Sequence, residues 1–129
     1  SHQAFAKALA ACVDSSGGAS VAAMAEAADV TSRHVDRLFA RYLGITPKML
    51  GRIQRFQGAL RALMRDPEGT LAAVASAAGY YDQAHFIKDF RLFSGGVPRG
   101  YRGYYPPQGP RDFAPNVVVF LQDEAPGRE

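Results

Sequence analysis

Apolar residues recur at helical spacing through most of the chain. Val35, Leu38, Phe39 and Tyr42 fall at i, i+3, i+4 and i+7, so they share one face of a helix. Spacing of this kind predicts helices over residues 3–13, 32–43, 47–65 and 83–93, and alanine-rich segments predict two more over 21–28 and 71–78. We therefore expect an all-α fold, with one last helical turn at 98–101.

Capping residues set the expected helix limits. Good N-cap candidates stand directly before the apolar periods: Ser20, Thr31 or Ser32, Thr46, Thr70 and Asp82. Gly44 follows the third helix, where a C′ glycine ends a helix. The predicted inner face of the long helix comprises Leu50, Ile53, Phe56, Leu60 and Leu63, and that of the last helix comprises Phe86, Phe90 and Phe93. In the first helix Phe5, Leu9 and Val13 recur at four-residue spacing.

Part of the sequence is repeated. VAAMAEAADV at 21–30 matches LAAVASAAGY at 71–80 with an offset of fifty residues, and the stretch ending at Pro47 matches the stretch ending at Pro98 with an offset of fifty-one. Because loops tolerate length changes better than helices, this change of offset at a turn indicates a duplicated helix–turn–helix. We place the two modules at about 20–44 and 70–95.

The outward faces of the two second helices carry the candidate chemistry. In a helix–turn–helix the second helix lies in the major groove, where arginine reads guanine and aspartate accepts from cytosine. The predicted base-reading residues are Arg33, Asp36 and Arg37 in the first module and Gln83, Ala84, Ile87 and Lys88 in the second. Asp36 has an alternative role as a salt-bridge partner of Arg33 or Arg37.

The charge of the chain supports a polyanionic partner. Its formal net charge is +3, and the stretch from Arg33 to Arg61 holds seven lysines and arginines against one acid, Asp36. A solvated helix face is the alternative explanation. We expect phosphate contacts from Arg41, Lys48, Arg52 and Arg91.

The helix at 47–65 is expected to link the modules. Its 19 residues would be about 28 Å long, and successive major-groove faces recur about every 34 Å. The two reading helices, 32–43 and 83–93, are therefore predicted to enter two successive major grooves of double-stranded DNA.

Other chemistries find little support in the sequence. The single cysteine, Cys12, lies in an alanine-rich run and is interpreted as a small core residue. His34 and His85 occupy matching positions but lack a third ligand, so we expect no metal, and we see no catalytic constellation, no cofactor motif and no membrane span. We expect a protein that is not an enzyme.

Residues 103–129 differ from the rest. Five prolines, four of them between residues 106 and 115, exclude a long helix there, so we expect an irregular, proline-rich C-terminal tail. Its apolar run at 117–121 is expected to dock somewhere, which leaves an alternative function for the chain as a helical protein-interaction module.

Residues 3–102 resemble the DNA-binding domain of AraC/XylS-family transcription regulators. The most specific matches lie in the second half: ASAAGY at 75–80, QAHF at 83–86, FRLFSG at 90–95 and PRGYR at 98–102. The first half agrees through RLF at 37–39 and GITP at 44–47, whereas Ala84 replaces a serine of the family pattern.

The resemblance implies a fold and a function. It implies about seven helices, two helix–turn–helix motifs joined by a linker helix, and base contacts at the positions named above together with Ser32. It also implies a bacterial, cytoplasmic, nucleoid-associated regulator, more often an activator, that works with RNA polymerase. Family members usually join this domain to a sensor domain that binds a small-molecule effector, so we expect the chain to be the C-terminal fragment that lacks it.

Overall fold

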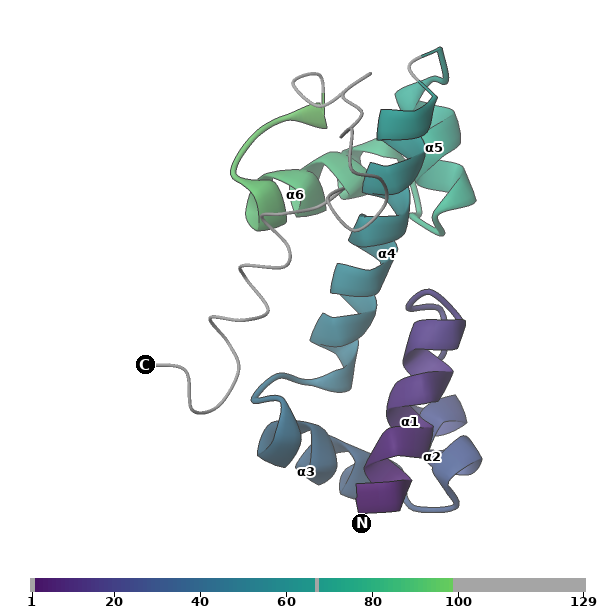
Figure 1. Cartoon of the computed structure of the whole chain (residues 1–129). Helices are drawn as coiled ribbons and strands as arrows, with labels where there is room; N and C mark the ends of the chain where they lie inside the picture. Colours follow the sequence, from purple (N-terminus) through teal and green to yellow (C-terminus); the bar gives the residue numbers. More distant parts are fainter. Residues whose placement is uncertain (1, 67, 99–129) are drawn as a thin grey trace. The chain divides into compact units, whose positions relative to one another are not determined.

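The computed structural model describes residues 2–66 and 68–98 of the 129 residues (Figure 1). Within these residues the fold is all-α, as predicted, and contains no strand. The helices are α1 (His2–Asp14), α2 (Val21–Ala28), α3 (Ser32–Tyr42), α4 (Pro47–Arg65), α5 (Leu71–Ala77) and α6 (Gln83–Ser94). The expected turn at 98–101 lies, beyond Pro98, outside the described residues, as do the tail at 103–129 and its apolar run.

The helices begin where side chains cap them. Ser20 Oγ accepts from the Ala23 amide at 3.1 Å, and Thr70 Oγ1 accepts from the Ala73 amide at 3.0 Å. The predicted caps of the other helices accept in the same way: Thr31 from the His34 amide at 3.1 Å, Thr46 from the Met49 amide at 3.0 Å, and Asp82 from the His85 amide at 2.8 Å. Thr31, rather than Ser32, is therefore the cap of α3, because a cap oxygen satisfies an amide that the helix itself leaves without an acceptor.

The described residues form two compact units, 2–54 and 55–98. The first unit contains α1, α2, α3 and the beginning of α4. The second contains the remainder of α4 with α5 and α6. Both units include an alanine-rich helix followed by one of the two predicted reading helices.

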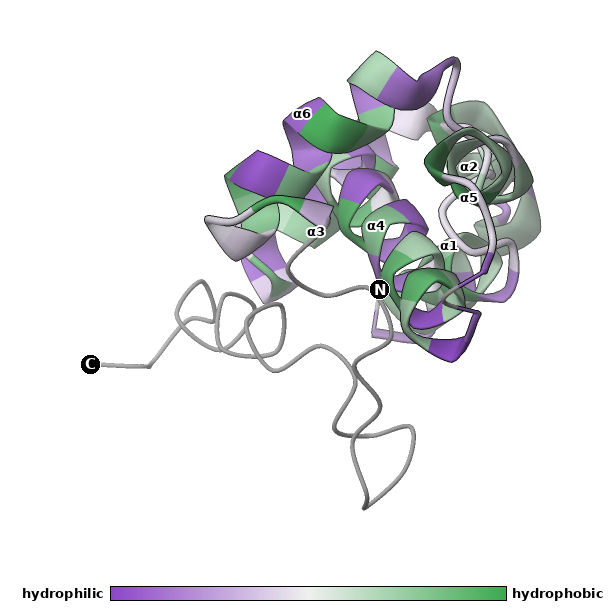
Figure 2. Ribbon diagram, turned by 90° about the horizontal axis from the view of Figure 1, so that it is seen from above, coloured by the Kyte–Doolittle hydropathy of each residue, from purple (hydrophilic) through white to green (hydrophobic). Residues whose placement is uncertain are grey.

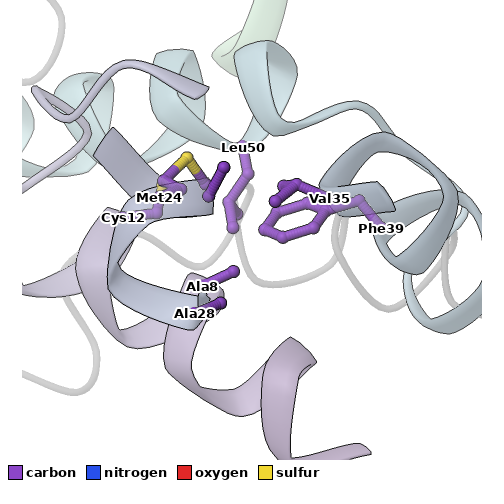
Figure 3. Packing of buried hydrophobic residues seen from close by; sticks show 8 residues of the cluster. Ala8, Cys12, Met24, Ala28, Val35, Phe39 and Leu50 are labelled. Carbon is purple, nitrogen blue, oxygen red and sulfur yellow. The ribbon is translucent and has the colours of Figure 1, made fainter. Parts of the chain in front are cut away.

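Alanine and cysteine side chains together with larger apolar ones fill the centre of the first unit (Figure 3). Side chains from α1, α2, α3 and the start of α4 point toward one another there: Ala8, Cys12, Met24, Ala28, Val35, Phe39 and Leu50. Cys12 is 1% exposed, which confirms it as a core residue. The four-residue spacing of Phe5, Leu9 and Val13 does not follow the buried face of α1, because Val13 is exposed and Ala8 is buried. Val13 lies one residue, about 100° of helical rotation, beyond Cys12 and so leaves the buried stripe.

Aromatic side chains hold the third helix of each unit. In the first unit Phe5 of α1 packs edge-on against Phe39 at 5.5 Å and stacks on Tyr42 at 4.7 Å between ring centroids. In the second unit Phe56 of α4 packs edge-on against Phe90 at 5.2 Å and lies 5.5 Å from Phe93. Both arrangements are favourable for aromatic quadrupoles.

These contacts show that the repeat is longer than the sequence analysis proposed. Each aromatic residue of the first cluster matches one of the second with an offset of 51. The second half of α4 repeats α1 at five identical positions: Gln3/Gln54, Phe5/Phe56, Ala8/Ala59, Leu9/Leu60 and Ala11/Ala62. The repeated unit is therefore a three-helix unit, and the long helix supplies the first helix of its second copy.

The turns inside the two helix–turn–helix motifs share one hydrogen-bond pattern. The Val30 amide donates to the Ala25 carbonyl at 3.0 Å, and the Tyr80 amide donates to the Ala75 carbonyl at 2.9 Å. Both turns need a left-handed residue, which is Asp29 at φ 57° in the first copy and Gly79 at φ 94° in the second. Arg55 lies over the ring of Tyr80, 5.7 Å from its centroid, and so packs against the second turn.

Substitution of two glycines of the second unit by alanine should change the stability of the protein in opposite directions. Gly79→Ala places a Cβ only 3.6 Å from Arg55 Nε, an ordinary contact, but the positive φ remains strained. We expect a loss of about 1 kcal/mol in the free energy of unfolding. Gly58 lies inside α4 with open space around a Cβ, and Gly58→Ala should gain about 0.5–1 kcal/mol. Urea unfolding of both variants checks this, and a shift of both in the same direction would contradict it.

Candidate nucleic-acid interface

The polar residues of α3 face away from the core. Val35, Leu38 and Phe39 are buried. On the remaining surface, Arg33, Asp36 and Arg37 are exposed and Ser32 is half-buried. The side chains predicted to read bases in the first module are therefore accessible together on one short helix.

Within the described part of the chain, the charged side chains of this face do not form the salt bridge that was the alternative role predicted for Asp36. Arg37 Nη2 donates to Nδ1 of His34 at 3.3 Å, one helical turn away. Among the described residues Asp36 forms no ion pair with Arg33 or Arg37. The carboxylate of Asp36 thus keeps its acceptor oxygens open to a donor such as a base amino group.

The corresponding face of α6 is less charged. Gln83, Ala84 and Lys88 are exposed and Ile87 is half-buried. Hydrophilic and hydrophobic bands alternate along this helix (Figure 2). A partner of α6 would meet one cation, an amide and two apolar side chains.

The buried face of α6 contains a residue that the sequence analysis missed. Phe86, Phe90 and Phe93 are buried as predicted, and Asp89 is also buried, with 1% of its surface exposed. It occupies the position of Leu38 in the first copy. The spacing 86, 89, 90, 93 marks it as inward, but a charged residue type argued against burial.

The two matching histidines are each engaged within their own unit. His34 accepts from Arg37, and Nδ1 of His85 accepts from the backbone amide of Tyr81 at 3.4 Å. A guanidinium group and a backbone N–H can only donate, so Nδ1 is the acceptor in both rings, which in the neutral form places the proton on Nε2. No group of three His, Cys, Asp or Glu residues suited to a metal occurs in the described part of the chain.

The predicted phosphate-binding residues lie on or beside the reading helices. Arg41 is in the last turn of α3, over the ring of Tyr42 at 5.7 Å, and Arg91 is in the last turn of α6. Arg41, Arg91 and Lys48 are exposed, whereas Arg52 of α4 is half-buried. The three exposed side chains can reach a polyanion without a change in the core.

Comparisons with known proteins agree with this geometry. Residues 24–104 match a family described as the helix–turn–helix domain. A crystal structure of a transcriptional regulator from Chromobacterium violaceum, described among AraC-type DNA-binding domain-containing proteins, shares the fold with a TM-score of 0.72 and 22% identity. The alignment covers 78% of this chain and 90% of that one. No match was found among curated proteins.

Two helix–turn–helix motifs with accessible polar second helices define a DNA-binding protein. The chain belongs to the AraC-type helix–turn–helix family, and its function is DNA binding in transcription regulation. None of the described helices combines the length and apolar character that a membrane span requires.

The asymmetry between α3 and α6 predicts unequal effects of removing one cation from each. Arg37→Ala should relax base preference by about 1–3 kcal/mol at one position of the bound sequence, because it removes a side chain that is predicted to bind guanine through two hydrogen bonds. Lys88→Ala should change base preference less. Binding profiles of both variants on a library of single-base variants of the bound duplex measure this, and equal losses would contradict the asymmetry.

Proposed function

We propose that the chain recognises a specific double-stranded DNA sequence by placing α3 and α6 in major grooves. The observation that carries the proposal is the repeated three-helix unit, in which the third helix buries one face and exposes a different polar face in each copy. A scaffold repeated with altered outward residues suits a protein that reads two different base sequences.

The chemistry of each reader suggests its target. Arg33 and Arg37 suit guanine, and Asp36 suits the amino group of cytosine, so α3 is assigned a GC-containing step. Gln83 suits adenine and Ile87 suits the methyl group of thymine, so α6 is assigned a weaker, partly apolar readout. Ser32, Ala84 and Lys88 complete the proposed base-facing sets.

We further propose that one chain reads two successive major grooves. The domain would then comprise residues 3–102, with modules at about 20–44 and 70–95 and α4 as the linker. Phosphate contacts from Arg41, Lys48, Arg52 and Arg91 would set its position on the duplex. The proposed recognition unit is thus a monomer bound to two half-sites.

The regulatory role is proposed from the family. We propose that the chain activates transcription through contact with RNA polymerase on the bacterial nucleoid. An effector would act only through a separate sensor domain. The second-best function, protein interaction through residues 117–121, rests on a segment outside the described residues.

The test is selection of bound duplexes from a random pool by the 129-residue chain. We expect an enriched consensus with two conserved blocks whose centres are about 10 base pairs apart. One block should change with Arg33→Ala and the other with Gln83→Ala. Enrichment of no sequence would overturn the proposed function, and a single block would overturn the two-groove arrangement.

Salt dependence provides a second prediction. Affinity for the selected duplex should fall steeply between about 50 and 200 mM salt, since phosphate contacts release counterions. Lys48→Ala and Arg91→Ala should each reduce the slope of log K against log salt by about 1. Lys7→Ala, which removes an exposed lysine from α1, is the matched control and should leave the slope unchanged. A flat salt response of the unmodified chain would contradict the phosphate assignment.

A further inference from the structure

Tyr81 is an additional residue in the second helix–turn–helix motif. The hydrogen bonds of the two turns match through Val30 and Tyr80 with an offset of fifty. The next capping residues, Thr31 and Asp82, match with an offset of fifty-one. The change of offset therefore falls on Tyr81, which has no counterpart in the first copy.

The side chain of Tyr81 projects into solvent. It is 91% exposed, whereas its neighbour Tyr80 is 5% exposed and packs against Phe86 with 5.3 Å between ring centroids. The turn thus directs one of two adjacent tyrosines inward and the other outward. The core offers no reason for the type of the outward residue.

The backbone at Tyr81 is nevertheless held in place. Its amide donates to Nδ1 of His85 at 3.4 Å, and the amide of His85 donates to the Asp82 carboxylate at 2.8 Å. These two bonds connect residue 81 to the first turn of α6. The aromatic ring therefore starts from a defined position one residue before the N-cap of the reading helix.

We infer that Tyr81 binds the DNA backbone beside the bases read by α6, an inference that rests on the proposed function. In a helix–turn–helix the first residues of the second helix approach the base edges, so the residue just before its N-cap faces the wall of the groove. A tyrosine hydroxyl is a regular donor to phosphate oxygens. The contact is neutral and acts beside α6, whose proposed base-facing residues include one exposed cation, Lys88, whereas those of α3 include two, Arg33 and Arg37.

Tyr81→Phe tests the inference, because it keeps the ring and removes only the hydroxyl. Binding to the duplex selected by the unmodified chain should weaken about three- to tenfold, the range of one lost hydrogen bond. The selected consensus and the salt slope should not change, since a neutral donor releases no counterion. Arg91→Ala is the contrasting variant, because it should lower the slope.

Phosphate ethylation interference locates the contact. One phosphate beside the block read by α6 should interfere with binding of the unmodified chain and lose that effect with Tyr81→Phe. Tyr81→Ala should bind no more tightly than Tyr81→Phe, and thermal unfolding of both variants should match the unmodified chain because the side chain is exposed.

Three results would overturn the inference. Unchanged affinity together with an unchanged interference pattern would show that the hydroxyl makes no contact. A new base preference in the Tyr81→Phe selection would show a base contact in place of a phosphate contact. Failure of the unmodified chain to enrich any duplex would instead reject the proposed function, and the inference would fall with it.

Discussion

The contact between the first and third helices of each unit determines where the reading helix can lie. Phe5 meets Phe39 and Tyr42 in one unit, and Phe56 meets Phe90 and Phe93 in the other. Each aromatic ring buries a large apolar area, and the edge-on geometry adds a directional preference. Because one face of the third helix is held in this way, its opposite face is presented to solvent in a fixed rotation.

Divergence between the copies is greatest where this constraint is absent. Outward positions change from Arg33 to Ala84 and from Asp36 to Ile87, which alters both charge and size. Inward positions keep an aliphatic or aromatic residue, although Val35 becomes Phe86, and the exception is Leu38, which is replaced by Asp89. The two copies therefore share the buried contacts that hold α3 and α6, whereas the outward residues of these two helices differ.

Much of the fold could be predicted from the sequence because local chemistry determines it. Hydroxyl and carboxylate caps, such as Thr31 and Asp82, mark the helix starts directly, and apolar spacing identifies the inner faces of α3, α4 and α6. The relation of α1 to the second half of α4 was harder to find. The loop after the first helix is one residue shorter in the second copy, so the offset changes from 51 to 50 there and back again at Tyr81.

Other features depend on tertiary contacts that residue type does not report. Val13 is as apolar as Cys12, but only the direction of the neighbouring helices decides which of the two is buried. Asp89 is buried against the expectation for its type. The outward faces of α3 and α6 followed from periodicity, whereas the exposure of Tyr81 and the hydrogen bond from Arg37 to His34 required three-dimensional geometry.

The matching histidines have a practical consequence. His34 and His85 stand at the same position of the two reading helices, and both accept a hydrogen bond at Nδ1. In their neutral form both imidazole rings therefore carry the proton on Nε2, and each copy contains one such ring. Nitrogen-15 magnetic resonance of these two rings would provide a separate spectroscopic signal for each reader, so that the order in which α3 and α6 engage a duplex becomes observable within one chain.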